Sequence, residues 1–138
     1  MDIQPAAQVP LPEGVVRVYC DLHRRCSSVK ALTGPSKGRV VAKPQQLVMR
    51  SVTFEISAAG QRRVRAEKIR NVHAYARGEC VSHDVSQVRD HPAAVRVRYN
   101  PHVHDTFIAC PANTPISGAA LLAIDGKDCW ALGVTQGT

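Results

Sequence analysis

Short β-favouring runs follow one another along the chain and are separated by turn-forming residues. The gaps carry turn signals such as Gly34-Pro35-Ser36-Lys37-Gly38 and Asp125-Gly126, the second of which favours a tight hairpin. Runs this short, joined by such turns, are typical of strands that pair with their neighbours in an antiparallel meander. The predicted strands are 15–20, 26–32, 38–43, 47–56, 71–81, 95–99, 106–110, 119–124 and 129–132.

One helix is expected among these strands. The strand over Leu47–Ile56 alternates in part, with a break near Arg50, and Ser57 follows it as a plausible N-cap of a helix that ends at about Lys68. Gly60 weakens this helix by about 1 kcal/mol relative to Ala, and its apolar face is narrow. The sequence therefore predicts an α+β fold, mainly a twisted antiparallel sheet with one short basic helix.

The two halves of the chain show a weak internal similarity. Val16-Arg17-Val18 compares with Val95-Arg96-Val97, 79 residues later, and the segment 35–38 compares with 115–118. A duplicated β-hairpin unit would produce such a pattern, and so would chance, because few residues are identical.

The chain length fits one domain. A chain of 138 residues buries roughly two-thirds of its unfolded surface, which suffices for a core without disulfides. Residues 1–14 contain Pro5, Pro10 and Pro12 and no structural period, so we expect a disordered arm followed by a single domain over 15–138. The polar segment 82–94 is expected to be a connector.

The charge favours a negatively charged partner. Eighteen Lys and Arg against eleven Asp and Glu give a formal net charge of +7. The cysteine count of five is odd and includes no Cys-x-x-Cys, which indicates free thiols in the cytoplasm. Neither a signal peptide nor a membrane-spanning run is expected, and exposed sheet edges favour a homo-oligomer.

Five cations lie within ten residues around one acid, Glu67, and three polar residues alternate directly after them. Guanidinium groups pair with phosphate oxygens, and His or Tyr side chains on one strand face can contact a base. The segment predicts an anion or nucleotide site; the alternatives are a solvated helix face and a structural His73. The candidate residues are Arg62, Arg63, Arg65, Lys68, Arg70, Asn71, His73 and Tyr75.

Catalytic patterns are absent from the sequence. No nucleophile elbow, phosphate loop or dinucleotide fingerprint occurs, so no catalytic residue and no cofactor is assigned. Cys20, His23 and Cys26, completed by His102 or His104, offer a zinc set, although their spacing departs from that of zinc fingers. Small buried cysteines explain the pattern more simply, and no metal is predicted.

Several segments resemble small accessory proteins of tailed bacteriophages and prophages, and the resemblance covers about Val15 to Leu132. It is carried by the segments Val16-Arg17-Val18-Tyr19, Leu22-His23, Gly38-Arg39-Val40-Val41-Ala42, Ala59-Gly60-Gln61-Arg62-Arg63-Val64, Asn71-Val72-His73-Ala74-Tyr75 and Arg98-Tyr99-Asn100-Pro101. It implies a setting: a protein made in the cytoplasm of an infected or lysogenic cell, with host takeover or defence evasion as its task.

Charge and setting together predict a non-enzymatic phage accessory protein that binds a phosphate-bearing partner, either nucleic acid or a nucleotide. The first alternative is a protein-interaction inhibitor that blocks an acidic or nucleic-acid-binding surface of a host protein. The second is a small metal-dependent enzyme that uses Cys20, His23, Cys26 and His102.

Overall fold

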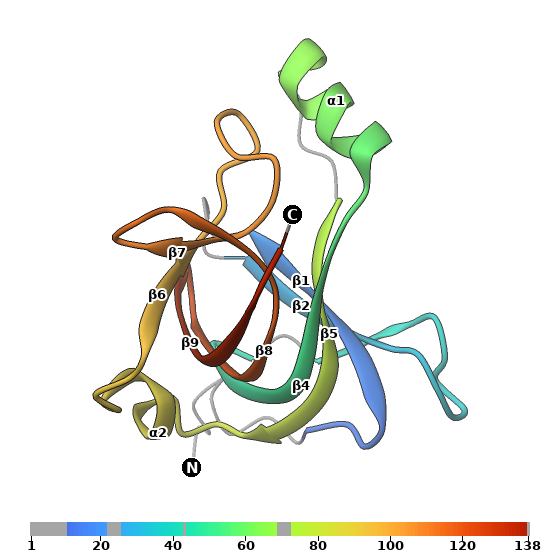
Figure 1. Cartoon of the computed structure of the whole chain (residues 1–138). Coiled ribbons are helices and arrows are strands. Elements are labelled where there is room, and N and C mark those ends of the chain that lie inside the picture. The colour runs from blue at the N-terminus through green and yellow to red at the C-terminus, as the bar shows by residue number, and fades with distance from the viewer. Residues whose placement is uncertain (1–10, 22–25, 43, 69–72, 138) are drawn as a thin grey trace, which may run out of the picture.

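The computed structural model describes residues 11–21, 26–42, 44–68 and 73–137. Its strands belong to one continuous sheet, with short helices outside it (Figure 1). In chain order the elements are β1 (Val15–Asp21), β2 (Cys26–Ala31), β3 (Val40–Ala42), β4 (Gln46–Ile56), α1 (Ala58–Glu67), β5 (Ala74–Ser82), α2 (Ser86–Arg89), β6 (Val95–Arg98), β7 (Ile108–Cys110), β8 (Thr114–Asp125) and β9 (Asp128–Gln136). The predicted fold, mainly an antiparallel sheet with a small helix, is confirmed.

Strand pairing divides the sheet into two regions on either side of β4. On one side lie β5, β1, β2 and β3, in that order, and we call these four strands the open wing. On the other side β8 pairs with β7 and β9, and β6 pairs with the same two strands. The pairings among β6, β7, β8 and β9 therefore form a closed ring of strands, and we call these four strands the closed unit.

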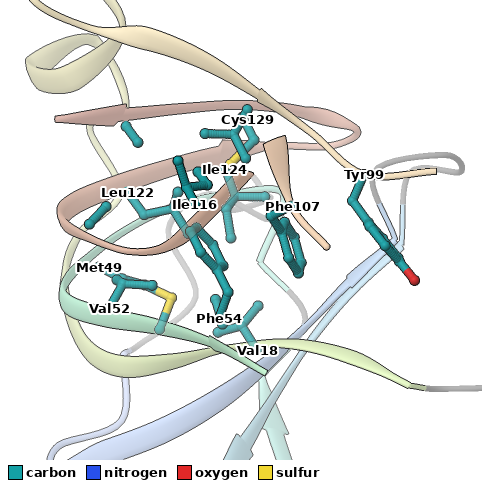
Figure 2. Packing of buried hydrophobic residues seen from close by; sticks show 14 of the residues in the cluster. Val18, Met49, Val52, Phe54, Tyr99, Phe107, Ile116, Leu122, Ile124 and Cys129 are labelled. Atoms are coloured by element: carbon teal, nitrogen blue, oxygen red, sulfur yellow. The ribbon is translucent and has the colours of Figure 1, made fainter. Parts of the chain in front are cut away.

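The main core gathers the inner side chains of both regions and of β4. Val18 comes from the open wing, while Ile116 and Leu122 come from β8 of the closed unit. Between them the rings of Phe54 and Phe107 stack with their centroids 4.4 Å apart (Figure 2). Aromatic pairs at this separation add to the stabilisation that comes from burial.

Strand β4 contains the break that the sequence predicts near Arg50. Its register with β5 shifts between Arg50 and Thr53, and Ser51 has a positive φ of 53°. Gly78 of β5 lies against this bulge, where an added Cβ would come within 2.6 Å of the Arg50 carbonyl oxygen. A side chain at this position would therefore push the two backbones apart.

Helix α1 begins and ends where the sequence predicts. The Ser57 side chain accepts a hydrogen bond from the Gly60 amide at 3.2 Å, as an N-cap does, and Lys68 closes the helix with a left-handed φ of 57°. The helix stands beyond the sheet, next to the loop between β6 and β7 (Figure 1). Of its predicted apolar face, Val64 is buried, Ala58 is exposed and Ile69 lies outside the described residues.

A second helix corrects the prediction of a single one. The segment 82–94, expected to be a connector, contains the four-residue helix α2. Val85 and Val88 are buried against Val48 and Ala123, which form a second, smaller cluster on the other side of the sheet. The signal was two valines three residues apart, which is too short a pattern to distinguish from loop sequence.

Two further interpretations stay predictions. The internal duplication is one of them. The other is the disordered N-terminal arm over 1–14, because residues 1–10 lie outside the described residues; within the remaining part of the arm, Leu11 is half-buried and packs against the core.

Candidate functional site

The predicted anion cluster is only partly available to a ligand. Arg62, Arg63 and Lys68 are exposed on or next to α1. Arg63 pairs with Glu67 at 3.5 Å, one helical turn away, which is the arrangement expected for a solvated helix face. Arg70 and Asn71 lie outside the described residues.

Arg65 holds α1 onto the loop between β6 and β7. Its Nε donates to the Pro101 carbonyl oxygen at 2.5 Å, and its Nη2 donates to the His104 carbonyl oxygen at 2.9 Å. Gln61, one turn earlier, donates to the His104 and Asp105 carbonyl oxygens at 3.0 and 3.1 Å. Because these donors satisfy loop carbonyls, the position of Arg65 indicates a structural role.

His73 is placed in the interior. Its side chain is 5% exposed, and Nε2 lies 2.7 Å from the hydroxyl oxygen of Tyr99, which also accepts from Gln61 Nε2 at 3.0 Å. The Tyr99 hydroxyl therefore links Gln61 of α1 to His73 in one buried hydrogen-bond network. Burial raises the pKa of Tyr99, so the hydroxyl stays protonated in this network. The structure thus favours the structural histidine that the sequence left open.

Tyr75 faces away from the core and meets side chains from neighbouring strands. Its ring lies 6.3 Å from that of Tyr19, at an angle of 59°. The Arg17 guanidinium carbon lies 4.9 Å from the Tyr75 ring centroid, and Arg17 Nε pairs with Glu55 Oε1 at 3.1 Å. His73 and Tyr75 therefore do not form the common face that strand alternation predicts.

Strand register gathers further cations beside these rings. Arg17 of β1 lies opposite Lys30 of β2 on one side and opposite Arg77 of β5 on the other. Tyr19 and Tyr75 are opposite each other, two residues along the same strands. Neighbouring strands lie about 4.8 Å apart, so one row of cations and one row of tyrosines run side by side. We call these five residues the wing face.

Several residues of the wing face were missed by the sequence reasoning. Alternation in β1 does place Arg17 and Tyr19 on one side and Val16 and Val18, both fully buried, on the other. No local signal shows that β1 pairs with a strand about 60 residues later, which is what brings Arg77 into the row.

The zinc set that the sequence offers stays a hypothesis, because the side chains of Cys20, His23 and Cys26 lie outside the described part of the chain. Within the described part, no group of three or more His, Cys, Asp or Glu side chains is placed to hold a metal ion. Burial raises the pKa of Cys80 to about 11, which keeps this thiol protonated and unreactive at neutral pH.

Comparisons with known proteins place the chain in a family of bacteriophage proteins. Residues 11–132 match the model of the Mycobacterium phage L5 gene 82 protein family, and the chain belongs to this family. The gene 82 protein of Mycobacterium phage L5 is 32% identical over 110 residues, which cover 75% of this chain and 84% of that protein. The predicted resemblance to small phage proteins is thus confirmed. No solved structure matches the chain.

Neither of the helices in the described ranges has the length and apolar character needed to cross a membrane.

Proposed function

We propose that this phage protein is a non-enzymatic accessory protein that binds a single-stranded nucleic acid across the wing face. The observation that carries the proposal is the row formed by Lys30, Arg17 and Arg77, in register on three adjacent strands and next to two tyrosines. Host takeover or defence evasion is the task that fits a small phage protein with such a surface.

The row of cations destabilises the sheet, and a bound polyanion would remove this destabilisation. Like charges directly opposite each other on neighbouring strands destabilise a sheet. Glu55 offsets the charge of Arg17, but within the described residues no carboxylate lies within ion-pair distance of Lys30 or Arg77. Phosphates bound along the row would neutralise these charges and release counterions.

The tyrosines favour a nucleic acid over a simple polyanion. Tyr19 and Tyr75 are half-buried on the outer side of the sheet, and aromatic rings on a sheet face are platforms on which unpaired bases stack. Each stacked base contributes about 1 to 3 kcal/mol, and stacking tolerates any base sequence. A single nucleotide is the smaller ligand that the same residues could take.

The exposed cations next to α1 give the second candidate contact. Arg62, Arg63 and Lys68 keep the anion-binding role that the sequence predicts, as do Arg70 and Asn71, which lie outside the described residues. They would extend the track of a longer strand, or bind in place of the wing face.

The alternative proposal, a blocker of an acidic or nucleic-acid-binding surface on a host protein, would use the same cations without the rings. Replacing Tyr75 with Leu removes a stacking partner and keeps the charge. If Tyr75→Leu left the binding of both RNA and DNA unchanged while Arg77→Gln weakened it, this charge-only mode would be favoured. The metal-dependent enzyme is tested by elemental analysis of the purified protein.

Fluorescence anisotropy with labelled single-stranded DNA and RNA tests the proposal. We expect the double variant Lys30→Gln/Arg77→Gln to bind at least about tenfold more weakly, with the salt slope reduced by about 1.4, which is about 0.7 for each lost phosphate contact on a single strand. The matched control is Arg62→Gln/Arg63→Gln, which removes the same charge from α1. Loss of binding in this control alone would move the site to the helix and refute the wing face.

A further inference from the structure

A hollow of about 410 Å³ lies on the closed unit, away from the wing face. Its walls come from the end of β6, the loop that follows it and the turn between β8 and β9. The volume falls within the range of about 300 to 1,000 Å³ that is usual for small-molecule sites. The lining is rich in cations.

One positive and one negative side chain in the wall of the hollow already neutralise each other. Arg96 pairs with Asp128 across β6 and β9, and its guanidinium carbon also lies 5.7 Å from the ring centroid of Trp130. Asp128 is the only carboxylate among the residues that line the hollow, and Arg96 neutralises it. The charge that remains for a ligand is therefore positive.

Arg98 and Lys127 supply that charge. Arg98 is the last residue of β6 and Lys127 lies in the β8–β9 turn; both are exposed. Within the residues that the structure describes, neither has an ion-pair partner. A guanidinium and an ammonium group in one hollow are a common means of holding a phosphate.

His104 adds a neutral donor. Its Nδ1 accepts a hydrogen bond from the Asn100 amide at 2.9 Å, so in the neutral ring the proton is on Nε2. Burial, and secondly the charge of Arg98, lower the pKa of His104, which keeps the ring neutral at pH 7. The backbone bond thus fixes both the ring and the nitrogen that donates.

Val103 shows where an organic group would lie. Val103 is 69% exposed and lines the same hollow as the two cations. A bare phosphate would fill only a small part of the volume and would leave this valine uncovered.

We infer that the hollow binds a small phosphomonoester, with its phosphate held by Arg98, Lys127 and His104 Nε2–H and its organic part packed against Val103. The site uses no residue of the wing face, so it goes beyond the proposed function and can fail or succeed independently of it. The phosphate could belong to a free metabolite or to the 5′ end of a nucleic acid strand.

Isothermal titration calorimetry of the full chain with ribose 5-phosphate, AMP, inorganic phosphate and adenosine tests the inference. We expect the two phosphomonoesters to bind with a Kd of about 1 mM or tighter, inorganic phosphate to bind more weakly, and adenosine not to bind. Arg98→Gln and Lys127→Gln should each weaken phosphomonoester binding about tenfold, since each removes one charge-assisted contact.

The control variant Lys37→Gln removes one exposed cation from the loop between β2 and β3 and should leave these affinities unchanged. Comparing 5′-phosphorylated with 5′-hydroxyl oligonucleotides distinguishes the sources: tighter binding of the phosphorylated strand, lost in Arg98→Gln, indicates a strand end. The inference is overturned if the wild-type chain binds neither phosphomonoester, or if Arg98→Gln and Lys127→Gln, folded by circular dichroism, bind as the wild type does.

Discussion

The outer surfaces of the open wing and the closed unit differ, although both regions are antiparallel sheet. Over β8 and β9, helix α2 covers apolar side chains such as Ala123 and Trp130. Within the described residues no helix packs on the outer side of β1 and β5, and that side carries the wing face. A sheet face without a helical cover must be compatible with water, but solvation alone does not require a row of cations beside tyrosines.

The largest effect is expected from the core that the two regions share. Phe107 is fully buried between Phe54 and Tyr99. Phe107→Ala should lower the free energy of unfolding by about 3 to 5 kcal/mol, because it removes the ring and leaves a cavity. Urea denaturation measures this, with Tyr75→Leu as the control, whose stability should change far less. Equal losses in both variants would contradict the division into core and wing face.

Weakening the packing of helix α2 on the closed unit should lower the free energy of unfolding by a smaller amount. Val88 of α2 is fully buried, so Val88→Ala should cost about 2 kcal/mol by loss of two methyl groups and creation of a small cavity. Val81→Ala is the matched control, because Val81 is 45% exposed, and surface changes are usually within about 0.5 kcal/mol. If the two variants were equally stable, the packing of α2 on β8 and β9 would not contribute to stability.

His104, in the loop between β6 and β7 that α1 contacts, should make the stability of the fold depend on pH. The pKa of His104 is lowered below its usual 6.5 in the folded chain, so the unfolded chain binds the proton more readily. Stability should therefore fall as the pH drops through about 6.5 and level off below the folded pKa. His104→Asn, which retains an acceptor for the Asn100 amide, should show a smaller fall in thermal midpoint between pH 7.5 and 5 than the wild type.

His102→Asn is the control for this prediction, because His102 is exposed and lies only two residues from His104 in the same loop. The assignment to His104 would be wrong if His102→Asn reduced the pH dependence as much as His104→Asn does.

The smallest effect on stability is expected at the wing face. Lys30→Gln/Arg77→Gln removes like charges from the row and should leave the free energy of unfolding unchanged or raise it by up to about 1 kcal/mol. Thermal and urea unfolding at low salt measure the change. A loss of more than about 1 kcal/mol would show that these cations stabilise the sheet and would weaken the case for a ligand.

Sequence reasoning predicted the local parts of this fold. The β-favouring run over 15–20 predicted β1, Ser57 marked the start of α1, and Asp125-Gly126 marked the hairpin between β8 and β9. Each of these depends on residues that are close in the sequence.

The candidate site was harder to predict from the sequence, because it depends on contacts between residues that are far apart along the chain. The clamp from Arg65 to Pro101 and the bond from His73 to Tyr99 join residues 36 and 26 positions apart, and they give a structural role to two predicted ligand contacts. The pairing of β1 with β5 likewise placed Arg77 beside Arg17. A local charge count cannot distinguish a cation that contacts loop carbonyls from one that faces solvent.

The unpaired side of β3 limits how copies of this chain could join. Among the described strands, β3 alone has a single neighbour; it is three residues long, with Val40 53% exposed and Lys37 and Arg39 just before it. Two copies joined edge to edge here would use up both edges, so such growth stops at a pair and cannot run on into fibres. The facing cations would repel each other at low ionic strength, so added salt would favour pairing of copies while it weakens the hold on a polyanion.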